Sequence, residues 1–190
     1  MKKKIAFVHN AMWEMYNFRG ELLQELKAKG YEITVICPPD EKNAHYFTDL
    51  GIKLLTVPMS RKGTNIKEDL QLVKNLFKVY KKEKFDLVFH YTIKPNIYGT
   101  LAAKLAGIKS IAITTGLGYV FLHNNITSLI AKFMYKFSLA FANEVWFLND
   151  DDMNIFLDKD LITERQAFKL PSEGINTKRF VTKEKNRKDS

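Results

Sequence analysis

Short apolar runs of strand length alternate along this chain with longer segments that carry apolar residues at helical spacing. This alternation is typical of a parallel sheet covered by helices on both faces. The sequence therefore predicts an α/β fold built on a Rossmann-like, doubly wound parallel sheet. The predicted strands are Lys4 to Val8, Glu32 to Cys37, Lys53 to Val57, Leu87 to Phe89, Ser110 to Thr114, Val145 to Leu148 and Ala167 to Leu170.

The segments between these runs carry the helical pattern. Apolar residues recur every three or four positions, and glycine follows two of the segments where a helix is expected to stop. The apolar row that begins with Ile66 and Leu70 is expected to face the sheet, and the small Gly99 is expected to allow close packing. The predicted helices are Phe18 to Lys29, Ile66 to Lys82, Pro95 to Ala106 and Ile126 to Ala142.

Length and composition indicate one soluble domain. A chain of 190 residues, 46% of them apolar, has enough material for a single hydrophobic core. We expect residues 1–181 to form that domain and the charged residues 182–190 to begin a linker. The single cysteine, Cys37, excludes an intrachain disulfide and favours a reducing, cytoplasmic setting. No signal peptide or membrane-spanning segment is evident in the sequence.

The net charge of +9 indicates attraction to an anionic partner. Charge by itself fits nucleic acid, an anionic lipid surface or a phosphorylated substrate. The basic residues lie on predicted helix faces without the interleaved exposed aromatic residues of a recognised nucleic-acid motif, which disfavours nucleic acid as the partner.

Ligands bind open parallel sheets at the carboxyl ends of the strands, so the loops after the strands hold the candidate sites. The loop after the first strand has no GxGxxG motif, which disfavours a dinucleotide-binding fold. In this loop Asn17 is expected to cap the next helix. Arg19 stands beside that helix start, so the two residues are candidates for holding a phosphate. The alternative is that Asn17 is only a cap and Arg19 only a surface residue.

The loop after the fourth strand gathers polar groups beside a helix start. Lys94 is a candidate anion-binding residue, expected to be exposed and to contribute little to folding. His90, at the strand end, is a candidate catalytic residue, and a structural histidine is the common alternative. After the fifth strand, Gly116 and Gly118 would let the backbone approach a ligand, unless they only form a turn.

Two further segments have alternative interpretations. The acidic cluster Asp150 to Asp152, together with Asn149 before it, is expected to cap the following helix, and a metal site is the less favoured interpretation. The helix from Ile126 to Ala142 has Ser128, Lys132 and Lys136 on one narrow stripe and apolar residues nearly everywhere else. We expect one side of it to be buried, and contact with a bilayer surface is the other option.

Taken in order, the strand-end loops resemble those of glycosyltransferase family 4, which has the two-domain GT-B architecture. They are most similar to bacterial enzymes that extend polyprenyl-diphosphate-linked sugars. The glycine-rich first loop of many family members is replaced here by Asn10-Ala-Met-Trp-Glu14. The resemblance covers nearly the whole chain and rests on Asn17-Phe-Arg-Gly20, Tyr91-Thr-Ile-Lys-Pro-Asn-Ile-Tyr-Gly99, Thr115-Gly-Leu-Gly118, Phe147-Leu-Asn-Asp-Asp151 and Leu170-Pro-Ser-Glu-Gly-Ile-Asn-Thr-Lys-Arg-Phe180.

The resemblance implies the N-terminal, acceptor-binding half of a retaining GT-B enzyme that requires no cofactor and usually no metal. Its partners would be a lipid-linked saccharide acceptor, an anionic surface at the inner face of the cell membrane, and a nucleotide-sugar donor held by a C-terminal domain that this chain lacks. The substrate-binding residues that it implies are Asn17, Phe18, Arg19, Tyr91, Thr92, Lys94, Asn96, Tyr98, Thr115, Gly116, Gly118 and Glu173. The expected membrane contacts are Phe121, Leu122, Lys132, Phe133 and Lys136.

Two alternatives share this fold. A free-standing acceptor-binding subunit of a split glycosyltransferase would use the same chemistry with a separate donor-binding partner. An NAD-dependent oxidoreductase domain is disfavoured because the glycine motif after the first strand is missing.

Overall fold

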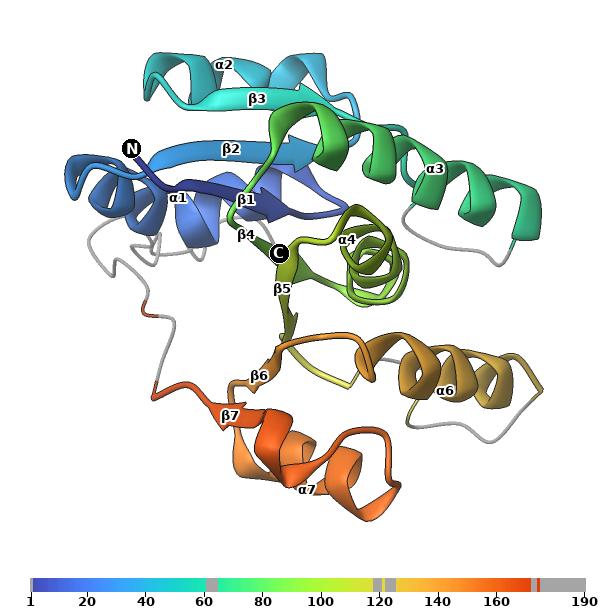
Figure 1. Cartoon of the computed structure of the whole chain (residues 1–190). Helices are drawn as coiled ribbons and strands as arrows, with labels where there is room; N and C mark the ends of the chain where they lie inside the picture. Colours follow the sequence, from blue (N-terminus) through green and yellow to red (C-terminus); the bar gives the residue numbers. More distant parts are fainter. Residues whose placement is uncertain (1, 61–64, 118–120, 122–125, 172–173, 175–190) are drawn as a thin grey trace, which may run out of the picture.

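The computed structural model describes residues 2–60, 65–117, 121, 126–171 and 174. Seven parallel strands form one sheet in the order β3-β2-β1-β4-β5-β6-β7 (Figure 1). All seven predicted strands are confirmed, with small shifts at their ends. They are β1 (Lys4–Val8), β2 (Glu32–Cys37), β3 (Lys53–Thr56), β4 (Leu87–Tyr91), β5 (Lys109–Thr114), β6 (Glu144–Phe147) and β7 (Ala167–Lys169).

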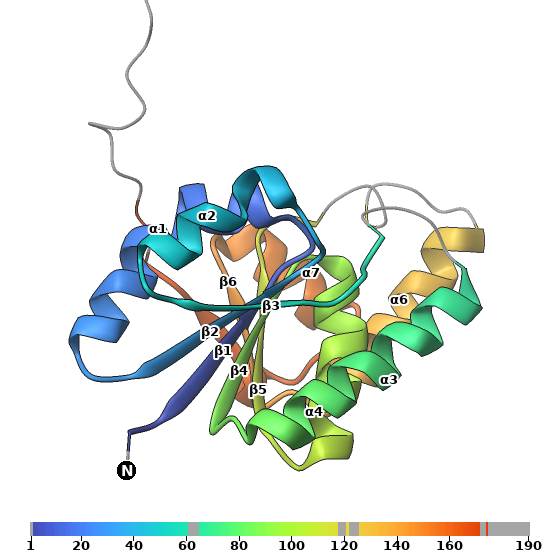
Figure 2. The same cartoon turned by 90° about the horizontal axis from the view of Figure 1, so that it is seen from above.

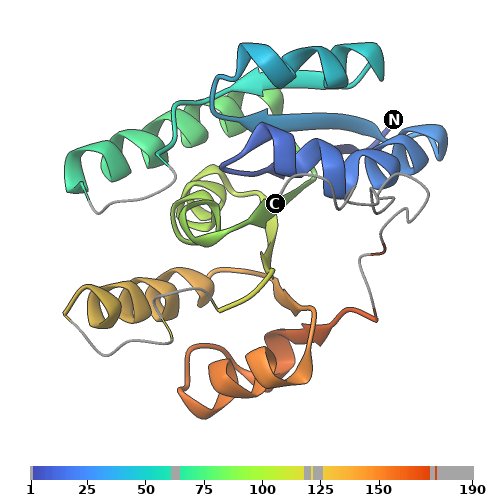
Figure 3. The same ribbon diagram turned by 180° about the vertical axis from the view of Figure 1, so that it is seen from behind.

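Helices cover both faces of the sheet, which confirms the doubly wound fold. One face is covered by α1 (Met12–Ala28) and α2 (Glu41–Asp49), and this face is seen best in Figure 3. The opposite face is covered by α3 (Ile66–Glu83), α4 (Thr100–Ala106) and α6 (Ile126–Leu139), as Figure 2 shows. The remaining elements are α7 (Asp150–Asp158), a π-helical turn η1 (Pro95–Gly99) and a 3-10 turn η2 (Glu164–Gln166).

Buried side chains pack between these layers on both faces of the sheet. Phe7 packs beneath α1, and its neighbour Val8 packs beneath α3 and α4, because successive side chains of a strand point to opposite faces. A third cluster, which includes Tyr135, Leu139 and Phe156, joins α6 and α7 to β5 and β6. Because all neighbouring strands are parallel, their carboxyl ends lie at one edge of this sheet.

Helix α1 begins earlier than the sequence indicates. It starts at Met12, not at Phe18, because Met12 and Met15 are buried in the core beside β1. Asn17 consequently lies inside the helix, where its Nδ2 donates a hydrogen bond to the Trp13 carbonyl at 2.9 Å. The prediction that Asn17 caps this helix is wrong.

Helix α3 has the predicted bounds but a rotated buried face. Ile66 is 75% exposed and Leu70 is 66% exposed, so the predicted sheet-facing row is wrong at its start. The face that packs on the sheet carries Leu72, Leu76 and Tyr80.

Candidate functional site

A cavity opens at the carboxyl ends of three neighbouring strands. β1 lies between β2 and β4 in the sheet, so the direction of strand connection reverses between β1 and β4. Such a switch point is where open α/β sheets bind ligands. The cavity volume of about 330 Å³ is at the lower end of the usual range for small-molecule sites. The cavity is lined by Asn10, Thr92, Ile93, Lys94, Asn96, Thr114, Thr115, Gly116 and Tyr135.

The chain leaves β4 in an unusual conformation at this cavity. Thr92 has a φ of 69°, in the left-handed region that a β-branched residue rarely adopts. The helix that follows continues as the π-helical turn η1, which begins at Pro95. Strained residues and π-turns concentrate at functional sites, so both features direct attention to this strand exit.

Three cavity residues have a buried side-chain oxygen that finds no hydrogen-bond partner within the described part of the chain. They are Thr92 Oγ1, Asn96 Oδ1 and Thr114 Oγ1. The orientation of the Asn96 amide is fixed because its Nδ2 donates to the Ile113 carbonyl at 3.0 Å. Buried polar groups in folded proteins are nearly always paired, so these oxygens are groups that a ligand would satisfy.

Tyr135 closes the cavity from α6. Its side chain is only 2% exposed. Burial raises the pKa of the phenol, and the neighbouring Asn96 amide lowers it by less. The hydroxyl therefore stays protonated and adds an uncharged polar group to the wall.

Lys94 reaches the cavity, but it is not the exposed cation that the sequence predicts. Its Nζ lies 2.7 Å from Asp69 Oδ1 and donates a second hydrogen bond to Ser60 Oγ at 2.7 Å. The side chains of Lys94 and Asp69 are each 9% exposed. The expectation of a solvated lysine is wrong, because Lys94 is buried in a pair with Asp69, which compensates its charge.

Asp69 gathers further polar groups around this ion pair. Its Oδ2 accepts a hydrogen bond from the Tyr98 hydroxyl at 2.7 Å. Burial, and after it this contact with Asp69, raises the pKa of Tyr98. Tyr98 thus supports α3 and does not line the cavity at the switch point. A second cavity of about 420 Å³ lies against α3; Lys94 lines both cavities, and Asp69 lines the second one.

His90 is a core residue. It is fully buried, and its ring nitrogens lie 2.9 Å from the Tyr80 hydroxyl and 3.3 Å from Thr100 Oγ1. Burial lowers the pKa of the imidazole to about 3. A Cβ atom at Gly99 would lie 2.5 Å from His90 Cδ2, which confirms that Gly99 allows close packing. A catalytic role for His90 is contradicted, because its ring is buried between α3 and the helix that follows β4.

The candidates on α1 lie apart from the cavity lining. Arg19 is 8% exposed, its guanidinium carbon lies 4.9 Å from the centre of the Tyr91 ring, and its Nη1 donates to the Phe18 carbonyl at 3.1 Å. Tyr91 is buried in the core, and Phe18 is exposed beside Trp13. Arg19 therefore lies within α1 and not beside its start, so the helix-terminus argument for a phosphate there fails.

The remaining predicted residues divide into three cases. Thr92, Lys94, Asn96, Thr115 and Gly116 line the cavity as a group. Gly118, Glu173 and Leu122 lie outside the described residues. The acidic cluster forms the first turn of α7.

The first turn of α7 is capped by a side chain. Asn149 Oδ1 accepts the backbone N–H of Asp152 at 2.7 Å, as the capping interpretation predicts. Over the ranges that the structure describes, no three His, Cys, Asp or Glu side chains are grouped to hold a metal ion.

Helix α6 presents apolar side chains to solvent. Its inner side packs through Tyr135 and Leu139, as expected for one buried side. Of the polar stripe, Ser128 is buried, Lys132 is half-buried and Lys136 is exposed, so the stripe runs from the buried side of the helix to its surface. The outer face carries Ile126, Leu129, Ile130, Phe133 and Phe137, each more than half exposed.

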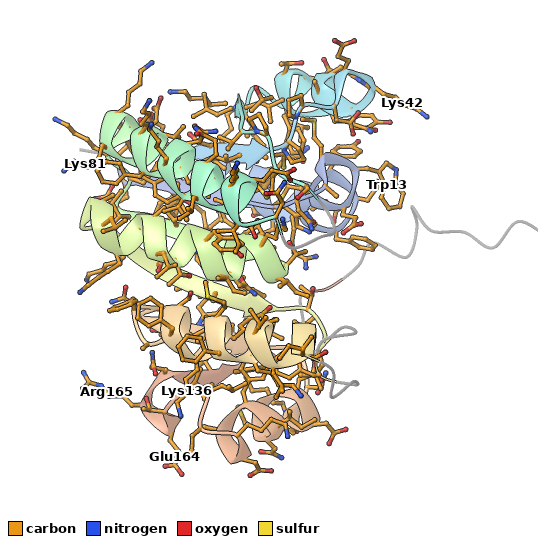
Figure 4. All side chains as sticks on the ribbon, turned by 90° about the vertical axis from the view of Figure 1, so that its right-hand side faces the viewer. Trp13, Lys42, Lys81, Lys136, Glu164 and Arg165 are labelled. Carbon is orange, nitrogen blue, oxygen red and sulfur yellow. The ribbon has the colours of Figure 1, made fainter. Side chains whose placement is uncertain are left out.

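Basic residues lie beside this apolar face. Figure 4 shows Lys136 on α6 within the layer formed by α3, α4 and α6, and Lys132 is half-buried on the same helix. Phe121 is different, because it is partly buried and its ring packs 4.9 Å from Phe156 against the third core cluster. Its expected membrane contact stays a prediction. No described helix is long and apolar enough to cross a bilayer.

Sequence reasoning missed four cavity residues. Asn10 and Thr114 sit at strand ends, so the rule that located the loops could have found them. Ile93 lies inside a run that the sequence did single out. Tyr135 comes from the middle of α6, and no local signal connects it to the strand ends.

Comparison with known proteins identifies relatives of the chain. Residues 4–149 match the family described as "Glycosyl transferase 4-like". Over 93% of its length the chain is 31% identical to the N,N'-diacetylbacillosaminyl-diphospho-undecaprenol alpha-1,3-N-acetylgalactosaminyltransferase of Campylobacter jejuni, covering 48% of that protein. Over 80% of its length it is 24% identical to the UDP-Gal:alpha-D-GlcNAc-diphosphoundecaprenol alpha-1,3-galactosyltransferase of Escherichia coli, covering 39% of that protein. The chain thus spans about half or less of the length of these curated relatives.

Solved structures share the fold at low sequence identity. They include glycosyltransferases and UDP-N-acetylglucosamine 2-epimerases. The Neisseria meningitidis epimerase bound to UDP-GlcNAc superposes with a TM-score of 0.66 at 15% identity, covering 90% of this chain and 47% of that one. At this level of identity the likeness supports the fold alone.

Proposed function

Because the chain belongs to the glycosyl transferase 4-like family, we propose that it is the N-terminal, acceptor-binding domain of a glycosyltransferase. The whole enzyme would move a sugar from a nucleotide sugar to a saccharide linked to a polyprenyl diphosphate. The observation that carries this proposal is the cavity at the switch point. There Thr92, Asn96 and Thr114 have buried side-chain oxygens without a hydrogen-bond partner among the described residues. The names of both relatives describe transfer to undecaprenyl-diphosphate-linked sugars, which supports this acceptor class.

The donor would be bound by a C-terminal domain corresponding to the part of the relatives that this chain does not match. The described cavity wall holds neither a histidine nor a solvent-facing carboxylate that could accept the proton of the attacking hydroxyl. These wall residues suit a domain that positions the acceptor while another domain holds the charged donor. We further propose that transfer retains the anomeric configuration: both relatives are named for an alpha linkage, which retention would produce from an alpha-linked nucleotide sugar.

Helix α6 would hold the domain against the cytoplasmic face of the membrane. Phe133 is 69% exposed, and it lies on a helix whose outer side is apolar with Lys136 beside it. An amphipathic surface of this kind gains apolar burial from the lipid and attraction from anionic headgroups. Peripheral binding there would bring the cavity close to a lipid-linked acceptor.

Titration calorimetry of the purified 190-residue chain tests the acceptor assignment. We expect a water-soluble, short-chain polyprenyl-diphosphate saccharide to bind, and UDP-sugars to bind weakly or not at all. The same chain is expected to show no sugar transfer, since the donor diphosphate would lack the groups that stabilise its charge. Tight binding of a nucleotide sugar without binding of the lipid-linked saccharide would reverse the assignment. Sugar transfer by this chain would refute the proposal that a separate C-terminal domain is needed to bind the donor.

A further inference from the structure

The part of the switch-point cavity wall that the structure describes carries almost no net charge. Among its described lining residues only Lys94 is charged, and its Nζ is 2.7 Å from Asp69 Oδ1 and 2.7 Å from Ser60 Oγ. The other polar groups are amides and hydroxyls, including the protonated Tyr135 phenol. A site for a diphosphate would instead concentrate uncompensated cations and N–H donors.

The orientation of Asn96 decides which kind of ligand this wall can satisfy. Its Nδ2 has two N–H groups: one donates to the Ile113 carbonyl, and the amide also hydrogen-bonds the Tyr135 phenol. The group left for a ligand is the unpartnered Oδ1, which is an acceptor. An ionised phosphate has acceptor atoms only and cannot pair with this oxygen. A hydroxyl or an amide N–H can donate to it.

The threonines have the same preference for a hydroxyl-rich partner. Thr92 Oγ1 and Thr114 Oγ1 each can donate one hydrogen bond and accept others, which matches sugar hydroxyls that also do both. Gly116, with a φ of 141°, adds a wall segment without a side chain.

We propose that the switch-point cavity binds a neutral pyranose ring of the acceptor saccharide, and not the diphosphate, with Asn96 Oδ1 accepting a hydrogen bond from a sugar hydroxyl or an acetamido N–H. The proposal rests on the proposed acceptor-binding function and assigns the saccharide part of the acceptor to this wall. The Lys94–Asp69 pair holds the wall in place and takes no part in recognising charge.

Two-dimensional NMR of the ¹⁵N-labelled chain tests the class of ligand. The probes are methyl glycosides of galactose, glucose, N-acetylgalactosamine and N-acetylglucosamine, with inorganic pyrophosphate as the anionic probe. We expect at least one glycoside to shift the amide resonances of Thr92, Asn96 and Gly116, and pyrophosphate to leave them unchanged. Shifts of these resonances by pyrophosphate, or by none of the glycosides, overturn the proposal.

A matched pair of threonine variants separates recognition from folding. Thr114→Val keeps the shape of the side chain and removes the unpartnered hydroxyl, so glycoside affinity should fall about tenfold while the thermal midpoint stays level or rises. Thr100→Val removes a hydroxyl that contacts His90 outside the cavity, so it should lower the midpoint and leave glycoside affinity unchanged. Unchanged affinity in Thr114→Val, or an equal loss in Thr100→Val, contradicts the proposal.

These results are distinguishable from a failure of the proposed function. If the soluble lipid-linked acceptor binds while pyrophosphate alone shifts the cavity resonances, the acceptor-binding function stands and the saccharide assignment falls. If the lipid-linked acceptor does not bind at all, the proposed function itself fails.

Discussion

Lys94 Nζ and Asp69 Oδ1 lie 2.7 Å apart, and each side chain is 9% exposed. This pair joins the helix start after β4 to α3, and the Tyr98 hydroxyl donates to the other oxygen of Asp69. The lysine that the sequence marks as an anion-binding group therefore holds two elements of the fold together. We expect its substitution to lower the free energy of unfolding, with any effect on ligand binding secondary to that loss.

Lys94→Met should destabilise the domain by about 3–5 kcal/mol, because it leaves the Asp69 carboxylate buried without its partner. Lys94→Met combined with Asp69→Leu should recover much of this loss. The control is Lys169→Met, whose partner Asp150 is 58% exposed, with an expected cost of about 1 kcal/mol or less. Urea unfolding measures all three variants. Equal costs for Lys94→Met and Lys169→Met would show that burial of the Lys94 pair is unimportant.

His90 makes the stability of the domain depend on pH. Burial lowers its folded-state pKa to about 3, whereas the unfolded chain has the ordinary value of about 6.5. Between these two values only the unfolded state takes up the proton, so stability falls as the pH falls. The expected slope is about 1.4 kcal/mol per pH unit, or about 2 kcal/mol lost at pH 5 relative to neutral pH.

Denaturant unfolding from pH 7.5 to pH 4 measures this contribution. The informative comparison is the slope of unfolding free energy against pH, because His90→Gln also changes the absolute stability. The variant should lose the His90 part of the slope. A variant with the same slope as the original chain would place the titrating group elsewhere.

Gly99→Ala should destabilise the domain by about 1–3 kcal/mol, since the new Cβ would lie 2.5 Å from His90 Cδ2 and the buried ring has nowhere to move. Gly20→Ala in α1 is the matched control. The nearest atom to its Cβ is on Tyr16 at 3.5 Å, so the substitution should stabilise by about 0.5–1 kcal/mol. Thermal unfolding compares the two, and a shift of the same sign in both would contradict the close contact.

Membrane binding should depend on the outer face of α6. Phe133→Ser is expected to reduce binding to anionic vesicles roughly tenfold or more, because the exposed phenyl ring would no longer be buried in lipid. Leu22→Ser on α1, 43% exposed on the opposite face, is the control and should have little effect.

Vesicle flotation in low and high salt separates the two contributions. Lys136→Gln should weaken binding to anionic vesicles in low salt and have no effect on neutral vesicles. Binding that is equal on neutral and anionic vesicles would rule out the electrostatic part, and a loss in Leu22→Ser equal to that in Phe133→Ser would rule out α6 as the contact.

The sequence by itself determined the sheet and most of the helices. Strand-length apolar runs and helical periodicity are local signals, because a buried strand and a half-buried helix each impose their own spacing on the chain. The same signals placed Thr92, Asn96 and Gly116 at a common sheet edge, and these residues do line one cavity. Helix α2 was missed because its nine residues give a weak pattern, although Asp40 caps it.

Only the tertiary structure decided what each polar side chain at that edge does. His90 and Lys94 look equally available in the sequence, yet Tyr80 and Asp69 of α3 bury them, and α3 precedes β4 along the chain. Tyr135 joins the cavity because α6 folds back over η1. The charge state and exposure of a side chain depend on which distant groups pack against it, and that packing is fixed when the helices close over the sheet.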